Sequence, residues 1–182
     1  LKSNIRKKFL KIRKLNFSEN RKIKFNRIIK IINNFNKKKL ILGGYYPVNF
    51  EIDCLQILSN LEKKKYEISL PVIKKNNQMD FYLYSFSDPL NLNKYGIPEP
   101  QPQKKNIVFP DILFVPMVAF DCNLLRLGYG GGYYDRYIEK LNKKKSFLSV
   151  GLAFDSQKMK KIPFDKFDKS LDIIITEKKI YK

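Results

Sequence analysis

Four of the eight glycines in this chain fall within five positions, inside a segment that reads R-L-G-Y-G-G-G-Y-Y-D-R over residues 126–136. They are Gly128, Gly130, Gly131 and Gly132. Glycine has no Cβ, so backbone N–H groups in such a segment can approach an anion closely. Apolar and aromatic residues then recur at helical spacing, which predicts that the loop leads into a helix N-terminus, where phosphates bind. The segment therefore predicts a phosphate-binding loop.

Charged residues flank this loop. Arg126 and Arg136 supply cations, and Asp135 falls in the first turn of the predicted helix, close enough to bound phosphates to share a magnesium ion with them. The segment lacks the Gly-Lys-Ser/Thr of a Walker loop and the usual context of a dinucleotide fingerprint. The spacing alone favours a metal-bound polyphosphate, and leaves open a glycine-rich turn that binds nothing.

The residue types that are absent also restrict the chemistry. The chain has no histidine and only two cysteines, Cys54 and Cys122. Ser-His-Asp and Cys-His catalysis are thereby excluded, and oxygen ligands favour magnesium or manganese over zinc. Two cysteines so far apart do not indicate a disulfide framework, so we expect reduced, largely buried thiols.

The formal net charge of +20 makes a nucleic-acid partner worth weighing. Residues 1–40 contain eleven lysines and four arginines against Glu19, a net charge of +14. Arginine, the residue suited to bidentate phosphate and base contacts, accounts for only 6 of the 37 basic residues. We therefore expect solvated surface lysines and no specific nucleic-acid partner, and keep a basic nucleic-acid-binding domain as the alternative.

The elements that position the loop follow from hydrophobic spacing. This spacing predicts a basic amphipathic helix over residues 5–15 and a helix that Ser18 caps, with its apolar face running to Phe35. Further helices are predicted over residues 51–61 and from residue 133. Short apolar or alternating runs predict strands over residues 40–46, 66–70, 79–84, 111–115, 147–152 and 171–176.

Strands that alternate with helices predict an α/β fold: one domain with an open, mainly parallel sheet and helices on both faces, a Rossmann-like three-layer arrangement. We expect Pro71 to close the second strand. Residues 85–110 form one long loop that should border or cover the site. Tyr46 ends the first strand and the glycine cluster follows the strand over 111–115, so both should reach the edge where such sheets bind ligands.

No apolar run approaches the roughly 18 residues of a membrane span, and no signal-like leader opens the chain. We expect a cytoplasmic protein with no membrane partner. A chain of this size fits a monomer with its own core.

The segment V-P-M-V-A-F-D-C-N-L-L-R-L-G-Y-G-G-G-Y-Y-D, residues 115–135, resembles the signature of the 5-formyltetrahydrofolate cyclo-ligases, also called methenyltetrahydrofolate synthetases. The resemblance extends to K-x-x-x-R at Lys2 and Arg6, Y-Y-P-V-N-F-E-I after the first strand, G-x-x-E-P at residues 96–100, and V-G-L-A-F and I-I-T-E near the C-terminus. Two positions depart from the family pattern. Leu124 stands where a glycine is usual, and Phe167 where many members have histidine.

The resemblance implies an ATP- and magnesium-dependent cyclisation of 5-formyltetrahydrofolate to 5,10-methenyltetrahydrofolate, with release of ADP and phosphate through a phosphorylated formyl group. It implies catalytic roles for Arg126, Tyr129 and Lys2, and magnesium ligation by Asp135 and Asp168. The implied ATP-binding residues are Lys2, Arg6, Arg126, Leu127, Gly128, Tyr129, Gly130, Gly131, Gly132, Tyr133 and Tyr134. The implied folate-binding residues are Tyr46, Glu51, Tyr129, Gly130, Gly131, Gly132 and Tyr133.

Simpler interpretations of these residues stay open at this point. Glu51 also fits an acid in the first turn of the third helix, favoured by the helix dipole. Tyr133 and Tyr134 also fit core anchors of their helix. Another ATP-dependent ligase or kinase on the same scaffold would differ only in the folate pocket.

Overall fold

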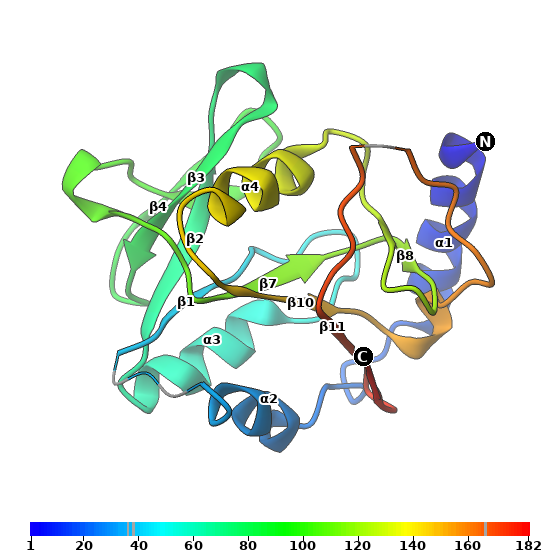
Figure 1. The fold of residues 1–182 in the computed structure, drawn as a ribbon, viewed down its shortest axis with the longest axis horizontal. Coiled ribbons are helices and arrows are strands. Elements are labelled where there is room, and N and C mark those ends of the chain that lie inside the picture. Colours follow the sequence, from blue (N-terminus) through cyan, green and yellow to red (C-terminus); the bar gives the residue numbers. More distant parts are fainter. Residues whose placement is uncertain (36, 38, 166) are drawn as a thin grey trace.

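The computed structural model describes residues 1–35, 37, 39–165 and 167–182, and its centre is an eight-stranded sheet (Figure 1). The strand order is β12-β11-β10-β7-β1-β2-β3-β6. The strands of this sheet are β1 (Ile41–Gly43), β2 (Glu67–Ile73), β3 (Met79–Tyr84), β6 (Ile107–Val108), β7 (Ile112–Pro116), β10 (Leu148–Leu152), β11 (Ile173–Ile175) and β12 (Ile180–Tyr181).

The central strands run parallel. β1 pairs in parallel with β2 and β7, β7 with β10, and β10 with β11. The antiparallel strands β3, β6 and β12 lie toward the two edges. The predicted open, mainly parallel α/β sheet is confirmed.

Helices cover both faces of the sheet (Figure 1). α2 (Phe25–Ile32) and α3 (Cys54–Lys63) pack on one face, where Ile28 and Leu58 join a core cluster with Leu42 of β1. α4 (Tyr133–Asn142) packs on the other face, where Tyr137 joins a second cluster with Leu113 of β7. α1 (Lys2–Asn16) lies apart, beside the end toward which the β7 arrow points. It therefore stands over the carboxyl ends of the parallel strands.

The predicted loop over residues 85–110 is partly ordered into secondary structure. It contains the hairpin of β4 (Leu90–Leu92) and β5 (Pro98–Pro100), a 3₁₀ turn at Lys104–Asn106, and β6. A further ribbon, β8 (Ala119–Phe120) with β9 (Arg126–Leu127), lies inside the segment that carries the glycine cluster. Pairs this short carry too little periodicity to be recognised from sequence.

Several predicted boundaries were wrong. Ser18 does not cap α2, because a turn closed by the Arg21 N–H and the Ser18 carbonyl, and then the extended residue Lys24, precede the helix. α3 begins after Asp53, whose carboxylate accepts the Gln56 N–H at 2.9 Å, so Glu51 precedes the helix and is not a first-turn acid. β2 continues through Pro71, since β1 pairs with β2 only as far as Ser69 and the missing N–H costs no bond beyond it.

The other boundary differences are smaller. Helix α2 ends before Phe35, which still packs against the core.

Cys54 is buried as expected, whereas Cys122 is exposed and so contradicts the expected burial of both thiols.

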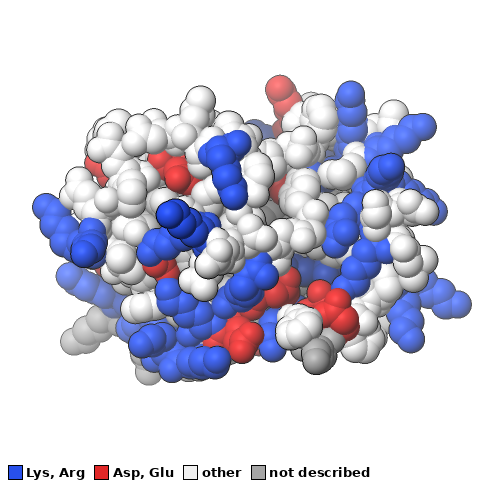
Figure 2. Space-filling view, turned by 90° about the horizontal axis from the view of Figure 1, so that it is seen from above, with Lys and Arg blue, Asp and Glu red and all other residues white. Residues whose placement is uncertain are grey.

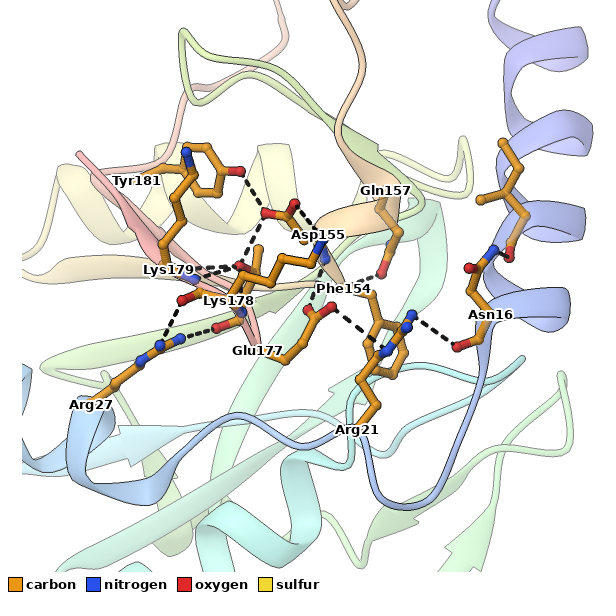
Figure 3. Close-up of polar contacts among 12 residues, drawn as sticks. Asn16, Arg21, Arg27, Phe154, Asp155, Gln157, Glu177, Lys178, Lys179 and Tyr181 are labelled. Carbon is orange, nitrogen blue, oxygen red and sulfur yellow. Dashed lines mark hydrogen bonds and ion pairs between the residues drawn. The ribbon is translucent and has the colours of Figure 1, made fainter.

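A polar network secures the C-terminal residues to the rest of the fold (Figure 3). Arg27 of α2 donates to the carbonyls of Thr176 and Lys178 at 2.7 and 2.6 Å. Asp155 accepts from the Tyr181 hydroxyl at 2.6 Å, and its own N–H donates to Glu177 at 2.9 Å. The I-I-T-E segment therefore has a structural role at the end of β11.

Basic side chains are spread over the face that Figure 2 shows, both at the end where α1 lies and at the opposite end, and acidic side chains lie among them. Among the described residues, no helix has the length and apolar character needed to cross a bilayer.

Candidate functional site

The direction of the sheet connections reverses between β1 and β7. β2 follows β1 on one side, whereas β7, β10 and β11 lie on the other. In open α/β sheets, ligands bind in the crevice outside the carboxyl ends of the strands at such a switch point. The segments that follow β1 and β7 are those that carry Glu51 and the glycine cluster. They meet at this edge, as predicted.

Arg13 of α1 occupies the crevice. Its side chain is fully buried, and its Nε donates to the carbonyl of Asn49, after β1, at 2.9 Å. Its Nη1 donates to the carbonyl of Met117, directly after β7, at 3.0 Å. Gln157 donates to the same Met117 carbonyl at 2.7 Å. The guanidinium group thus bridges the segments that follow the two central strands.

Glu51 lies beside this guanidinium group. Its Oε1 is 3.8 Å from Arg13 Nη1 and accepts the Tyr129 hydroxyl at 3.0 Å, and its Oε2 accepts the Val48 N–H at 2.9 Å. Burial raises the pKa of Glu51 to about 7, although the Val48 and Tyr129 hydrogen bonds and the Arg13 charge oppose the increase. The site therefore contains a carboxyl group that titrates near neutral pH.

Tyr129 brings the glycine-rich loop to these two residues. Its hydroxyl accepts from Arg13 Nη2 at 2.5 Å while donating to Glu51, and its ring lies 5.7 Å from the Arg13 guanidinium carbon. Burial raises the pKa of Tyr129 to about 12. The phenol therefore stays protonated and can act as a hydrogen-bond donor to Glu51 at neutral pH.

The glycine-rich loop leads directly into α4, as predicted. Gly132 precedes the helix with φ 67°, and Gly130 has φ 103°, so both adopt conformations that favour glycine. Gly128 has no such requirement, and a Cβ placed on it meets nothing within 4 Å. The space beside Gly128 is open to a ligand.

Two cations from the start of α1 reach this region. Arg6 Nε donates to the Gly128 carbonyl at 2.8 Å, and the guanidinium carbon lies 3.2 Å from the position of a Cβ on Gly130. Lys2 Nζ lies 2.6 Å from Asp168 and 2.9 Å from Asp165. The K-x-x-x-R pair thus contacts both the glycine-rich loop and the loop that precedes β11.

Arg126 interacts electrostatically with both predicted metal ligands, Asp135 and Asp168. Arg126 Nη2 donates to Asp135 at 2.9 Å and Nη1 to the Lys169 carbonyl at 2.9 Å, and the Lys169 N–H donates to Asp135 at 3.2 Å. Asp168 contributes to the same field around Arg126. Burial lowers the pKa of Arg126, and the two carboxylates oppose this decrease.

These carboxylates are compatible with Mg²⁺. Among the described residues, no group of three or more Cys, Asp or Glu side chains could hold a metal ion by itself. Mg²⁺ is commonly bound through one or two carboxylates, with waters and substrate phosphates as its remaining ligands. Asp135 and Asp168 are partly exposed, with 27% and 22% of their side-chain surface accessible, so both can be reached from solvent.

The other predicted residues contact other parts of the fold. Leu127 is buried in the β8–β9 ribbon, where its carbonyl accepts the Val118 N–H at 2.7 Å. Tyr134 packs against the core cluster beneath α4. Tyr133 also packs there, and its hydroxyl lies 3.2 Å from the hydroxyl of Tyr95, at the turn of the β4–β5 hairpin. Tyr46 lines an open hollow of about 470 Å³ beside α3.

The sequence of the chain matches that of a known protein family. A model of the 5-formyltetrahydrofolate cyclo-ligase family matches residues 1–177. The chain belongs to this family. It is 35% identical over 138 residues to the 5-formyltetrahydrofolate cyclo-ligase of Haemophilus influenzae, covering 72% of this chain and 73% of that protein. The Escherichia coli K12 cyclo-ligase is 30% identical over 138 residues, with 72% and 75% covered.

Solved structures support the same assignment. The 5,10-methenyltetrahydrofolate synthetase of Aquifex aeolicus matches 100% of this chain and 92% of its own, with 33% identity and a TM-score of 0.77. A synthetase from Mycoplasma pneumoniae shares the fold at 22% identity and a TM-score of 0.69, covering 97% and 98%. The family and the names of these relatives support 5-formyltetrahydrofolate cyclo-ligase activity, so the chain is an enzyme of this family.

The two departures from the cyclo-ligase pattern have different structural consequences. Leu124 adopts φ 61°, the left-handed conformation that a glycine would adopt readily, and the turn still forms around Asp121. Phe167 is 67% exposed, and its N–H donates to Asp165 at 3.0 Å. The leucine at position 124 therefore introduces strain into this turn and does not change its shape.

Arg13 is the residue of this cyclo-ligase site that sequence reasoning missed. The pattern of the predicted basic helix gave Arg13 no role of its own, whereas its side chain is buried. Its residue type was an available signal, since arginine is scarce in this lysine-rich chain. Each of the six arginines donates to at least one backbone carbonyl, a task that suits the planar, many-donor guanidinium group.

Proposed function

We propose that this cyclo-ligase converts 5-formyltetrahydrofolate and ATP into 5,10-methenyltetrahydrofolate, ADP and phosphate through a phosphorylated formyl group. The observation that carries the proposal is the meeting of two sets of residues at one sheet edge. Tyr129 joins the glycine-rich loop, beside Arg6, to Glu51 in the segment after β1. A phosphate donor on the loop and a ring substrate at Glu51 would then be neighbours.

The reaction requires no protein nucleophile. The formyl oxygen attacks the γ-phosphorus of ATP, an O–P bond forms, and the bond to the bridging oxygen breaks as ADP leaves. N10 of the folate then attacks the formyl carbon and loses its proton, and the C–O bond breaks to release phosphate. Such chemistry depends mainly on positioning and on neutralisation of charge. It suits a chain without histidine.

We assign the phosphates to Lys2, Arg6, Arg126 and the backbone of the glycine-rich loop. Lys2 and Arg6 already lie beside the loops that carry Asp168 and Gly128. Cations placed in a partly buried site neutralise developing phosphate charge more effectively than cations in water. Mg²⁺ held by Asp135 and Asp168 would supply further neutralisation of the phosphates.

We assign the folate ring to Glu51 and Tyr129, with Tyr46 and Tyr133 at the borders of its site. A carboxylate accepts hydrogen bonds from two neighbouring donors, which matches the ring N–H and amino group of a pterin. Glu51 Oε1 and Oε2 each accept one hydrogen bond in the structure, so each oxygen retains a further lone pair. A pterin could therefore bind without displacing Tyr129.

The test is a spectrophotometric assay of methenyltetrahydrofolate formation from 5-formyltetrahydrofolate and Mg-ATP. We expect Glu51→Gln to raise the KM for folate and leave the Kd for ATP within about twofold. Asp168→Asn should raise the Kd for Mg-ATP, whereas Asp165→Asn, a neighbouring carboxylate that also contacts Lys2, should change it little. Binding of both ligands without product would overturn the proposal, and equal loss of both in Glu51→Gln would overturn the placement of folate.

A further inference from the structure

Arg13 provides the only positive charge that faces the Glu51 carboxyl group among the described residues. The ionisable groups packed around Glu51 come from α1, the segment after β1, the start of α3, the glycine-rich loop and α4. They are Arg13, Tyr45, Cys54, Tyr129 and Tyr134. Burial raises the pKa of Tyr45, Cys54 and Tyr134, so these three side chains are uncharged at neutral pH.

The position of the Arg13 charge is determined by the segments that follow β1 and β7. Its Nε and Nη1 donate to the carbonyls of Asn49 and Met117 in these segments, so the guanidinium plane cannot turn without losing both bonds. This orientation directs Nη2 toward the Tyr129 hydroxyl and leaves Nη1 3.8 Å from Glu51. A lysine ammonium group could keep the charge, but it could not make all three contacts in one plane.

We propose that Arg13 is a positioning residue for the folate substrate, which favours the ionised form of Glu51 and holds the Tyr129 hydroxyl against it. The inference rests on the proposed function, because it takes Glu51 as the acceptor of the pterin donors. Without Arg13, a buried carboxyl group in these surroundings would hold its proton at neutral pH and accept fewer hydrogen bonds. Arg13 therefore acts through Glu51 and Tyr129 and does not itself contact the reacting atoms.

The direct test is an NMR titration of the ¹³C-labelled Glu51 carboxyl group in the ligand-free protein. An opposite charge at this distance lowers a carboxyl pKa by about 1 to 3 units, so Arg13→Met should raise the pKa of Glu51 by that amount. Arg13→Lys should leave it within about one unit, because it keeps the charge. Arg27→Met is the matched control, since Arg27 also donates to two backbone carbonyls but lies away from Glu51.

The kinetic test is the pH dependence of kcat/KM for folate at saturating Mg-ATP. We expect Arg13→Met to lower kcat/KM about tenfold at pH 7. Near pH 9, where Glu51 is ionised again, the kcat/KM of this variant should return to within about threefold of the parent value. Arg13→Lys should keep the parent pH profile with a raised KM, because Tyr129 is no longer held. Arg27→Met should alter neither the profile nor the KM.

The outcomes separate this inference from the function on which it rests. An unchanged Glu51 titration in Arg13→Met would overturn the inference, and so would an equal loss of kcat/KM at every pH. If Arg13→Met fails to fold, the inference stands or falls on Arg13→Lys, where a KM equal to that of the parent enzyme would overturn it. If Glu51→Gln binds folate normally, the proposed function fails, whatever the NMR titration shows.

Discussion

The hydroxyl of Tyr129 donates to Glu51 Oε1 at 3.0 Å across 78 positions of the chain. This bond joins the glycine-rich loop to the segment after β1, and the Arg13 guanidinium contacts both residues. Two of the segments that match the family, the glycine-rich loop and Y-Y-P-V-N-F-E-I, thus meet through one phenol. The arrangement makes the hydroxyl of Tyr129, and not only its ring, a determinant of the site.

Tyr129→Phe should lower the free energy of unfolding by about 1 to 3 kcal/mol, because it leaves a buried donor on Arg13 without its acceptor. The variant should also raise the KM for folate. Tyr133→Phe is the control. The hydroxyl of Tyr133 contacts that of Tyr95, a residue 58% exposed, so its loss should change stability by less than about 0.5 kcal/mol. Urea unfolding of the two variants checks the contrast, which equal losses would contradict.

Glu51→Gln should change how stability depends on pH. The folded-state pKa of Glu51, about 7, lies above the ordinary glutamate pKa of 4.5, so the folded protein binds this proton more tightly than the unfolded chain. The resulting stabilisation is fully present below pH 4.5 and is lost as pH rises through 7. Between pH 4.5 and 7, the free energy of unfolding of the parent protein should fall by about 3 kcal/mol relative to that of Glu51→Gln.

Denaturant unfolding at several pH values measures this difference. The lowered pKa values of Asp80 and Asp111 act in the opposite direction, but both proteins share them and they cancel in the comparison. A difference in stability that stays constant from pH 4.5 to 7 would show that Glu51 does not titrate in this range.

Gly128→Ala and Gly132→Ala separate glycines needed by the fold from glycines needed by a ligand. Gly132→Ala should cost about 1 to 2 kcal/mol, because φ is 67° there. Gly128→Ala should leave stability within about 0.5 kcal/mol, since its Cβ would meet nothing within 4 Å. We nevertheless expect Gly128→Ala to raise the Kd for ATP. Calorimetric titration measures this, and unchanged affinity would place the phosphates elsewhere.

Leu124→Gly should be more stable than Leu124→Ala by about 1 kcal/mol, the reverse of the usual order. Both variants remove the same packing, but only alanine keeps the strain of φ 61°. Thermal unfolding of the pair gives the order directly. If alanine is the more stable, the strain at this turn is smaller than its dihedral angle indicates.

Local patterns predicted much of the fold. The alternation over Met79–Tyr84 and the apolar run of β7 were recognisable because neighbours along a strand alternate between faces or are buried on both. The start of α3 was misjudged although its signal is local, since Asp53 accepts the N–H of Gln56 only three residues on. Pro71 was misjudged because its effect depends on a distant strand. Pro71 is tolerated inside β2 only because β1 has already ended beside it.

The glycine cluster shows both what local chemistry decides and where it stops. Gly130 and Gly132 adopt the left-handed conformations that a loop into a helix requires, and glycine spacing predicts that loop. The group that lies over each glycine depends on α1, which is more than a hundred residues away. This group can be a backbone carbonyl, an arginine or a ligand. Helical spacing could place Arg6 on α1, but not over Gly128.

By itself, the sequence determined the α/β sheet, the loop at the start of α4 and the absence of histidine, since each depends on residue type and local spacing. Only the tertiary structure decided that Arg13 is buried, since its acceptors are at positions 49, 117 and 129. It also decided the surroundings of Glu51. The ionisation of a carboxyl group depends on burial and on charges a few ångströms away, and the folded chain brings these together from distant segments.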